Sequence, residues 1–316
     1  MLDQEMLDRM KAPGDRRPTI WRGGVLQVWV TRACDKACFG CTQGSNLAGK
    51  PGMITVDQYA EALDSLKGYF GVIGMFGGNP AVHPKFPELC EVLVSKVPFE
   101  QRGIWCNNPM TAANAMVMRG TFNPHVSNLN VHLDQEAHNL FYNHWPECRK
   151  ELKGLRQDSR HDGWWKSMVD LGYTEEERHD LISRCDVNQL WSAMIGVFRG
   201  ELRGWVCEIM GAMSMLNQQN SEYPDTGLRI EPGWWKKPME DFKEQVRFHC
   251  HHCSMPTRGH GELAIGGESE RVTAYHQEVV RPKTRDRLVQ LVVGRDQIHE
   301  NAFIHTTDYV ENGGRP

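Results

Sequence analysis

Two kinds of apolar pattern alternate along the first half of the chain. Short continuous apolar runs, rich in β-branched and aromatic residues, predict buried strands. These strands are predicted at 24–34, 71–78, 102–108 and 127–134. Between the first three, apolar residues recur at helical spacing over 56–66 and 86–97, and Thr55 with Gln58 forms a capping box at the start of the first helix. Strands that alternate with helices predict parallel βαβ units and an α/β fold.

The second half of the chain follows this alternation less clearly. Thr174 and Glu177 form another capping box, which predicts a helix over 173–185. Two apolar segments, 187–198 and 204–217, are interpreted as helices. Two strand-like pieces follow, at 271–280 and 287–294.

Length, charge and hydropathy narrow the function classes. The 316 residues are enough for one large α/β domain, or for a domain with a smaller appendage. The net charge of −4 gives no overall electrostatic field that would attract nucleic acid or an anionic membrane. A net charge does not exclude a local basic patch. No apolar run is long enough to span a bilayer, and the charged N-terminus lacks the apolar core of a signal peptide. We therefore expect a cytoplasmic protein with no membrane partner.

Cysteines are the most informative residue type. The chain has ten, and in the reducing cytoplasm they are expected to bind metal, to act in catalysis or to pack in the core rather than to form disulfides. The three cysteines Cys34, Cys38 and Cys41 begin at the end of the first predicted strand, the motif GGNP at 77–80 lies at the end of the second, and 107–108 lies at the end of the third. Loops at the carboxyl ends of parallel strands build the active sites of α/β folds. We expect these three loops to converge on one site.

Three neighbouring thiols do not complete most metal sites. A closed structural zinc site takes four ligands, and this loop offers no fourth. A cubane-type iron–sulfur cluster held by three thiolates keeps one iron without a protein ligand, so an exogenous ligand can bind there. A zinc site completed by a distant histidine or cysteine, and a chance grouping of core cysteines, are the alternatives.

The spacing C-x3-C-x2-C after the first strand resembles the signature of the radical S-adenosylmethionine (SAM) enzymes. The resemblance implies a partial (β/α)6 TIM-like barrel in which Cys34, Cys38 and Cys41 are the catalytic ligands of a [4Fe–4S] cluster. In that family the fourth iron binds SAM, whose reductive cleavage gives a 5′-deoxyadenosyl radical that abstracts hydrogen from the substrate. The resemblance also implies an electron donor of the flavodoxin or ferredoxin type.

The resemblance extends to residues expected around SAM. GGNP is similar to the family's GGEP segment, with Asn79 where the family usually has Glu, and an aromatic residue such as Phe39 often lies near the adenine. Glycine allows the backbone to approach a ligand closely. A plain turn at 107–108 and a satisfied polar residue at 134 are the alternatives there. The implied SAM-binding residues are Phe39, Gly77, Gly78, Asn79, Pro80, Asn107, Asn108 and Asp134.

A second set of cysteines occurs far along the chain. Cys250 and Cys253 form a CxxC pair within FHCHHC, and Cys185 and Cys207 precede it. This order is similar to the shortened SPASM, or twitch, subdomain of some radical SAM enzymes, in which four cysteines bind an auxiliary [4Fe–4S] cluster. Cys148 competes as the fourth ligand. A zinc site and a dithiol redox pair are the alternatives. The histidines that would serve zinc are His249, His251 and His252.

These patterns together predict the organisation and the function of the chain. The expected parts are an N-terminal lead-in at 1–23, a radical SAM barrel core at 24–180, an auxiliary-cluster α+β subdomain at 181–260 and a C-terminal extension at 261–316. We expect an enzyme that abstracts hydrogen from a small-molecule, sugar, amino-acid or nucleotide-type substrate, leading to dehydrogenation, epimerisation or a radical rearrangement. The alternative is a non-catalytic protein that binds zinc or iron, in association with nucleic acid.

Overall fold

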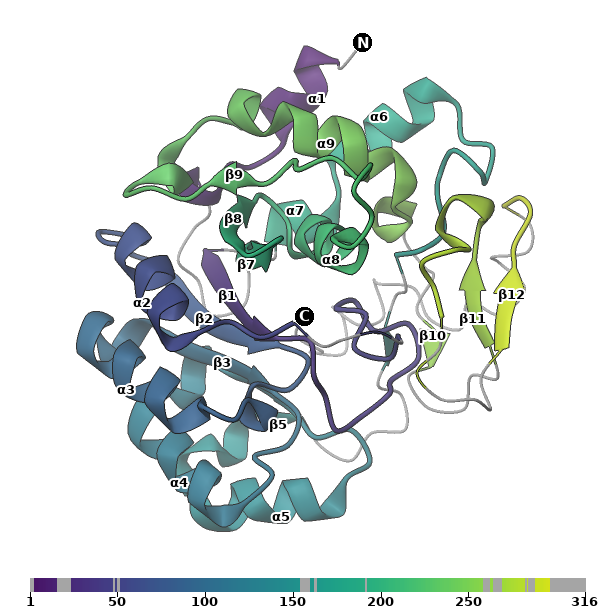
Figure 1. The fold of residues 1–316 in the computed structure, drawn as a ribbon. Coiled ribbons are helices and arrows are strands. Elements are labelled where there is room, and N and C mark those ends of the chain that lie inside the picture. The colour runs from purple at the N-terminus through teal and green to yellow at the C-terminus, as the bar shows by residue number, and fades with distance from the viewer. Residues whose placement is uncertain are drawn as a thin grey trace.

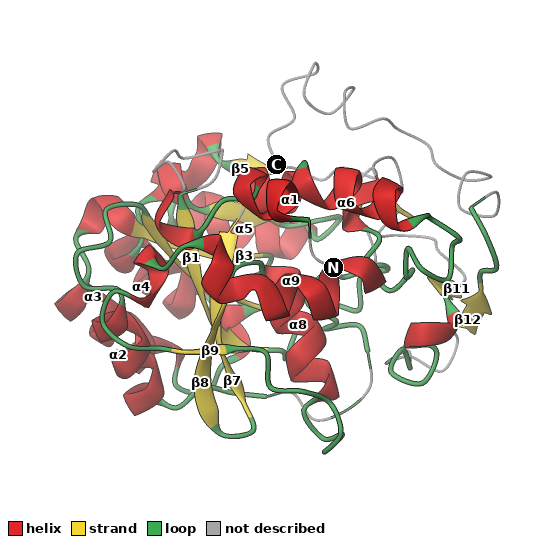
Figure 2. Ribbon diagram, turned by 90° about the horizontal axis from the view of Figure 1, so that it is seen from above, coloured by secondary structure: helices red, strands yellow, loops and turns green. Residues whose placement is uncertain are grey.

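A mostly parallel sheet with helices on both sides forms the centre of the molecule in the computed structural model (Figure 1). The structure describes residues 3–15, 24–47, 49, 52–153, 160–161, 164–190, 192–257, 262–263, 269–281, 283 and 288–295. Figure 2 shows helices α2 to α4 on one side of the strands and α8 and α9 on the other. The fold is therefore mixed α/β, as the sequence predicts.

The central sheet has eight strands in the order β5-β4-β3-β2-β1-β7-β8-β9. Its strands are β1 (Val25–Thr31), β2 (Val72–Gly77), β3 (Arg102–Cys106), β4 (Asn128–Asn130), β5 (Leu152–Lys153), β7 (Ser192–Phe198), β8 (Glu201–Trp205) and β9 (Leu228–Arg229). Strands β1 to β5 are parallel neighbours in chain order, and β7 lies parallel to β1 on its other side. β8 and β9 extend the sheet in antiparallel fashion. All seven residues of β1 are buried, which explains its largely apolar sequence.

Helices connect the parallel strands and pack beside one another in chain order. Thr55 and Gln58 form the predicted capping box of α2, and Thr174 and Glu177 form that of α6. α2 contacts α3, α3 contacts α4, and α4 contacts α5, which forms a helical layer along one face of the sheet (Figure 1). The helices are α1 (Gln4–Arg9), α2 (Val56–Ser65), α3 (Phe86–Lys96), α4 (Ala112–Thr121), α5 (Gln135–His144), α6 (Glu175–Ser183), α7 (Asp186–Leu190), α8 (Glu208–Asn217) and α9 (Lys243–His249).

Two small sheets lie outside the central one. β6 (Arg160–His161) pairs with β10 (Glu262–Leu263) in antiparallel fashion, and β11 (Ser269–Val272) pairs with β12 (Leu288–Leu291) in parallel fashion. β11 and β12 are at the edge of the molecule in both views, away from α2 to α4 (Figures 1 and 2). Only part of each strand-like piece predicted in the tail is therefore strand.

Two predicted elements differ from the structure. The segment 187–198 is not a helix throughout, because β7 occupies most of it, and its continuous apolar run belongs to a strand buried beside β1. The strand predicted over 127–134 ends at Asn130, and residues 131–134 form a turn before α5. The strands of 181–260 join the same sheet as β1 to β5, so the boundary near 180 stays a prediction, as does a six-stranded barrel.

Two further expectations concern the whole chain. Among the described residues, no helix is both long and apolar enough to cross a membrane. All ten cysteines lie within the described ranges, and none of them forms a disulfide bond there.

Candidate active site

Cys34, Cys38 and Cys41 lie in the loop that leaves the carboxyl end of β1, and each is partly buried. Burial raises the pKa of Cys34 far above its ordinary value, although a backbone hydrogen bond from Lys36 to its sulfur opposes the rise. The charges of Cys41, Asp35 and Cys38 raise it further. The positive charge of a bound metal centre would convert such a thiol into a thiolate at neutral pH.

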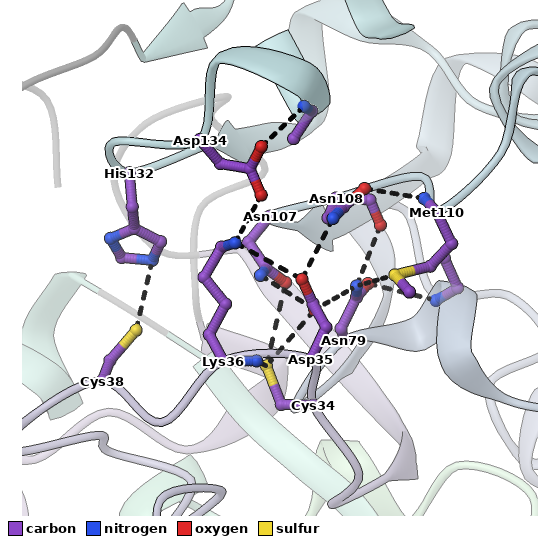
Figure 3. A network of polar contacts seen from close by, with 12 residues as sticks. Cys34, Asp35, Lys36, Cys38, Asn79, Asn107, Asn108, Met110, His132 and Asp134 are labelled. Carbon is purple, nitrogen blue, oxygen red and sulfur yellow. Dashed lines mark hydrogen bonds and ion pairs between the residues drawn. The ribbon is translucent and has the colours of Figure 1, made fainter.

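Asp35, between the first two cysteines, accepts hydrogen bonds from three asparagine side chains (Figure 3). Asn79 donates to its Oδ1 at 2.8 Å, Asn107 to Oδ1 at 3.2 Å and Asn108 to Oδ2 at 3.0 Å. Asn79 follows β2, and the other two follow β3. The predicted convergence of the three loops is confirmed, and a single carboxylate joins them.

The charge of Asp35 is stabilised inside this cluster of amides. Burial alone would raise its pKa, but the hydrogen bonds from Asn79 and Asn108, the charge of Lys36 and the hydrogen bond from Asn107 lower it below the ordinary value. Asp35 is therefore ionised at neutral pH and holds the cysteine loop against the ends of β2 and β3.

A fourth loop, after β4, contacts the cysteine loop through two side chains (Figure 3). Lys36 Nζ lies 2.5 Å from Asp134 Oδ2, and Cys38 Sγ lies 3.7 Å from His132 Nε2. Burial and then the charge of Lys36 lower the pKa of His132 to about 4, so its imidazole is neutral at neutral pH. The sequence pattern around His132 does not show which cysteine its ring contacts.

The GGNP segment packs closely against the end of β1 and the start of the cysteine loop. A Cβ added to Gly77 would lie 2.2 Å from the Thr31 carbonyl oxygen, and one added to Gly78 would lie 2.4 Å from that of Ala33. The backbone N–H of Asn79 donates to the same Ala33 carbonyl at 2.8 Å. The glycines thus permit close packing of this loop on the cysteine loop. Their contact with SAM stays a prediction.

Asn79 is fully buried and makes several hydrogen bonds within the protein. Its amide nitrogen donates to Asp35 Oδ1 and, at 2.9 Å, to the Asn108 carbonyl, while its amide oxygen accepts from the N–H of Ala81 and caps the short 3-10 helix Pro80–Val82. The structure therefore places Asn79 as a support of the cysteine loop. Pro80 begins the 3-10 helix, and Phe39 is buried in the cysteine loop.

Arg32 is a structural residue of this site that the sequence pattern does not indicate. It is 8% exposed, and its Nη1 donates to the carbonyl oxygens of Gly44 and Leu47, each at 3.0 Å. These bonds fix the chain that follows Cys41. Burial lowers the pKa of Arg32, which the charge of Cys41 opposes, so its positive charge lies near that sulfur. An arginine at a strand end carries no sequence signal of such a role.

The structure also brings together Cys185, Cys207, Cys250 and Cys253. Burial raises the pKa of Cys250 well above its ordinary value, and the charges of Cys185, Cys253 and Cys207 raise it further. Burial and the charge of Cys185 likewise raise the pKa of Cys253. Cys207 is the N-cap residue of α8, and Cys250 directly follows α9. We call these four residues the four-cysteine group.

Cys148 does not belong to this group. It is fully buried beside α5, with its sulfur 3.9 Å from the Phe141 carbonyl oxygen. Burial raises its pKa to about 12, and the charges that modify it are those of Glu147, Arg149 and Glu151 rather than those of other cysteines. Cys185 is thus the better-placed fourth member.

The three histidines beside the CxxC pair make contacts elsewhere. His249 Nε2 lies 2.8 Å from Thr226 Oγ1, and His251 Nδ1 accepts from Arg178 Nε at 3.1 Å. His252 Nδ1 lies 3.0 Å from Ser167 Oγ, and its ring stacks on Tyr275 with centroids 3.6 Å apart. The donors gathered at this place are therefore thiols, which suit iron–sulfur clusters and zinc alike.

A buried lysine lies beside the four-cysteine group. Lys166 is 1% exposed, and its charge partly opposes the rise in the pKa of Cys253 that burial and Cys185 cause. The sequence pattern does not point to this residue, because Lys166 lies far from every cysteine along the chain. A positive charge at this position stabilises thiolates and the net negative charge of a thiolate-bound centre.

Neither cysteine set has the geometry of a single-ion site. Within the described ranges, no three His, Cys, Asp or Glu side chains are close enough together to hold one metal ion. Each cysteine of a [4Fe–4S] cluster binds a different iron, so the ligating sulfurs of such a cluster are spread more widely than the ligands of one ion. An all-thiol donor set, thiols coupled through their charges and a nearby lysine or arginine fit such a cluster at both places.

Comparisons with known proteins give a likeness in structure and none in sequence. No protein-family model matches the chain. No curated protein sequence matches it either. Among solved structures, the chain is similar to "BtrN in complex with AdoMet and 2-DOIA", with a TM-score of 0.41 and 11% sequence identity over 73% of this chain and 92% of that one. The function of this chain must therefore follow from its own side chains.

Proposed function

We propose that this protein is a radical SAM enzyme. The observation that carries the proposal is the arrangement around Asp35, where the loops that follow β1, β2 and β3 meet beside three partly buried thiols. The carboxyl ends of parallel strands are the usual place of α/β active sites. The spacing of Cys34, Cys38 and Cys41 resembles that of the radical SAM signature.

In this proposal the three thiols hold a [4Fe–4S] cluster whose remaining iron binds SAM. The cluster supplies one electron, taken from a low-potential donor of the flavodoxin or ferredoxin type, which splits SAM into methionine and the 5′-deoxyadenosyl radical that takes a hydrogen atom from the substrate. Asp35 and Asn79 hold the loop that carries the thiols, and Arg32 fixes the chain beyond Cys41. Loop rigidity favours a cluster because the ligands need no reordering when it binds.

The four-cysteine group is proposed to hold an auxiliary [4Fe–4S] cluster. Three features support this: the charges of the four thiols interact, Lys166 lies beside them, and the neighbouring histidines bond to Thr226, Arg178 and Ser167. An auxiliary cluster would accept or relay an electron, or bind substrate. On this view residues 24–180 form a partial (β/α)6 barrel core and 181–260 a twitch-like subdomain.

The substrate class in this proposal is a small molecule of the sugar, amino-acid or nucleotide-derived kind, which the enzyme would dehydrogenate, epimerise or rearrange. The net charge of −4 gives no support to a nucleic-acid partner.

One experiment separates this proposal from a non-catalytic metal-binding protein. Chain reconstituted with iron and sulfide under anaerobic conditions is expected to be brown and to hold about eight iron atoms if both clusters form. With dithionite it should release 5′-deoxyadenosine from SAM. Colourless protein that binds zinc alone and leaves SAM intact would contradict the proposal.

Substitutions of single cysteines can distinguish the proposed catalytic site from the proposed auxiliary site. Replacement of Cys34, Cys38 or Cys41 by Ala should abolish SAM cleavage, whereas replacement of Cys250 or Cys253 should lower iron content and leave some cleavage. Circular dichroism of each variant serves as the folding control, because metal binding and folding are coupled. Equal loss of cleavage in all five folded variants would contradict separate catalytic and auxiliary sites.

A further inference from the structure

The turn between β4 and α5 reaches the cysteine loop at two points. Lys36 pairs with Asp134 at 2.5 Å, and Cys38 Sγ lies 3.7 Å from Nε2 of His132 (Figure 3). Both partners belong to one tight turn, in which the N–H of Asp134 donates to the Val131 carbonyl at 3.0 Å. The ion pair therefore fixes the turn that carries the imidazole.

We propose that His132 is a positioning residue that donates a hydrogen bond from Nε2 to the sulfur of Cys38 and thereby raises the reduction potential of the SAM-binding cluster. This inference rests on the proposed function, because it takes Cys38 as a ligand of that cluster. His132 itself is not a ligand.

The direction of the hydrogen bond follows from the chemistry of the sulfur. A cysteine that ligates iron is a thiolate and can only accept a hydrogen bond, so the imidazole must donate. A donor at this sulfur stabilises the additional negative charge of the reduced cluster more than it stabilises the oxidised form. The effect is strengthened by burial, and His132 is only 7% exposed.

The backbone of His132 indicates that this placement is imposed by its surroundings. Its φ is +51°, in the left-handed region that non-glycine residues seldom adopt. Its N–H donates to Asn130 Oδ1 at 3.3 Å, which stabilises the turn. Such conformations persist where neighbouring structure determines them, and they concentrate at functional sites.

The test measures the reduction potential of the cluster whose electron paramagnetic resonance (EPR) signal changes when SAM is added, in the full reconstituted chain. The variants are His132→Phe and His132→Leu, which lack a donor, and His132→Gln, whose amide retains one. His125→Leu is the matched control, because His125 is exposed and pairs with Glu151 at 3.3 Å, away from the cysteine loop.

We expect His132→Phe and His132→Leu each to lower the ratio of reduced to oxidised cluster about tenfold at a fixed potential, which equals a shift of about 59 mV for one electron. His132→Gln should recover part of this loss, and His125→Leu should match the wild type. A SAM-responsive signal with the same potential in all these chains would overturn the inference and leave the proposed function standing. A wild-type chain without any SAM-responsive signal would overturn both.

A second measurement covers the case in which the Phe and Leu variants hold no iron. Wild-type chain labelled with 15N-histidine should show a nitrogen coupling to the reduced cluster in pulsed EPR, because Nε2 lies next to a ligating sulfur. The coupling should be lost in His132→Gln. Absence of the coupling in the wild type would overturn the inference.

Discussion

Asp134 joins α5 to the cysteine loop: its Oδ2 lies 2.5 Å from Lys36 Nζ, and its Oδ1 accepts the N–H of Ala137 at 2.9 Å as the N-cap of α5. Burial would raise its pKa, but the Ala137 hydrogen bond and Lys36 lower it below the ordinary value. One carboxylate therefore orders both a helix start and the segment between Cys34 and Cys38.

The two roles of Asp134 can be separated by substitution. Asp134→Asn keeps a good N-cap side chain and loses the ion pair, so we expect a decrease of at most about 1 kcal/mol in the free energy of unfolding. Asp134→Ala also loses the cap and should cost about 1 kcal/mol more. Urea denaturation of both variants, alone and combined with Lys36→Met, measures how much the ion pair and the helix cap each contribute to the free energy of unfolding. Equal losses for the Asn and Ala variants would contradict the capping role.

Asp35 is expected to control how firmly the cysteine loop holds its metal centre. Asp35→Ala leaves the amides of Asn79, Asn107 and Asn108 without their shared acceptor, which should cost about 1–3 kcal/mol of stability. Iron should also leave the variant faster when a chelator is added, because the loop is less ordered. The control is Asp241→Asn, at an exposed position. Iron release as slow as in the wild type would contradict the role of Asp35.

The parts of the fold that follow from local pattern were predictable from the sequence. Thr55 with Gln58 and Thr174 with Glu177 marked helix starts because the capping box is a contact between neighbours in the chain. The segment that contains β7 was misjudged because a strand buried beside β1 has no alternation to distinguish it from a buried helix. The strands that lie beside β7 in the sheet are set by the tertiary fold alone.

The residues of the candidate site could largely be predicted from the sequence, but the contacts between their side chains could not. The convergence of the cysteine loop with the loops after β2 and β3 could be predicted, because the carboxyl ends of parallel strands meet at one edge of a sheet. Asn79 stays a predicted SAM-binding residue, but the hydrogen bonds of its amide to Asp35 and Asn108 could not be predicted. Lys166 lies beside Cys253 without any nearby cysteine in the sequence. Such pairings depend on distances between loops that are remote along the chain, which residue spacing does not encode.

The four-cysteine group offers a test with a matched control within the chain. Cys185→Ala should lower the iron content of reconstituted protein by about half, since one of two proposed clusters would be lost. Cys148→Ala should leave the iron content unchanged, because Cys148 packs against Phe141 and away from the group. Iron and sulfide analysis measures both. Loss of iron in the Cys148 variant alone would show that the wrong cysteine has been assigned.

His83 should make stability depend on pH. It is 5% exposed, its Nε2 donates to the Ile54 carbonyl at 3.0 Å, and its Nδ1 accepts from the Lys85 N–H at 3.1 Å, so the folded chain requires the neutral ring. Burial lowers its pKa, which the hydrogen bond to Ile54 opposes.

The sign of this dependence follows from linkage. The unfolded chain has the higher pKa, about 6.5, so it binds the proton first and the folded state loses stability as pH falls below that value. His83→Gln should therefore be less stable at pH 7.5 but show a shallower decline toward pH 5. Urea midpoints at a series of pH values measure both slopes. Parallel slopes would contradict a protonation-linked role of His83.

Gly78 should be required for packing between the GGNP segment and the cysteine loop. A Cβ there would lie 2.4 Å from the Ala33 carbonyl oxygen and 2.7 Å from that of Arg32, and backbone atoms at strand ends cannot move aside easily. Gly78→Ala should therefore destabilise the fold by about 1–3 kcal/mol and lower iron retention, because the displaced residues lead directly into Cys34. Gly120→Ala is the control, since Gly120 is exposed in α4 with nothing within 4 Å of an added Cβ, and it should gain about 0.5–1 kcal/mol. If both variants unfolded at the same urea concentration and kept the same iron content, close packing at Gly78 would not be what holds the cysteine loop in place.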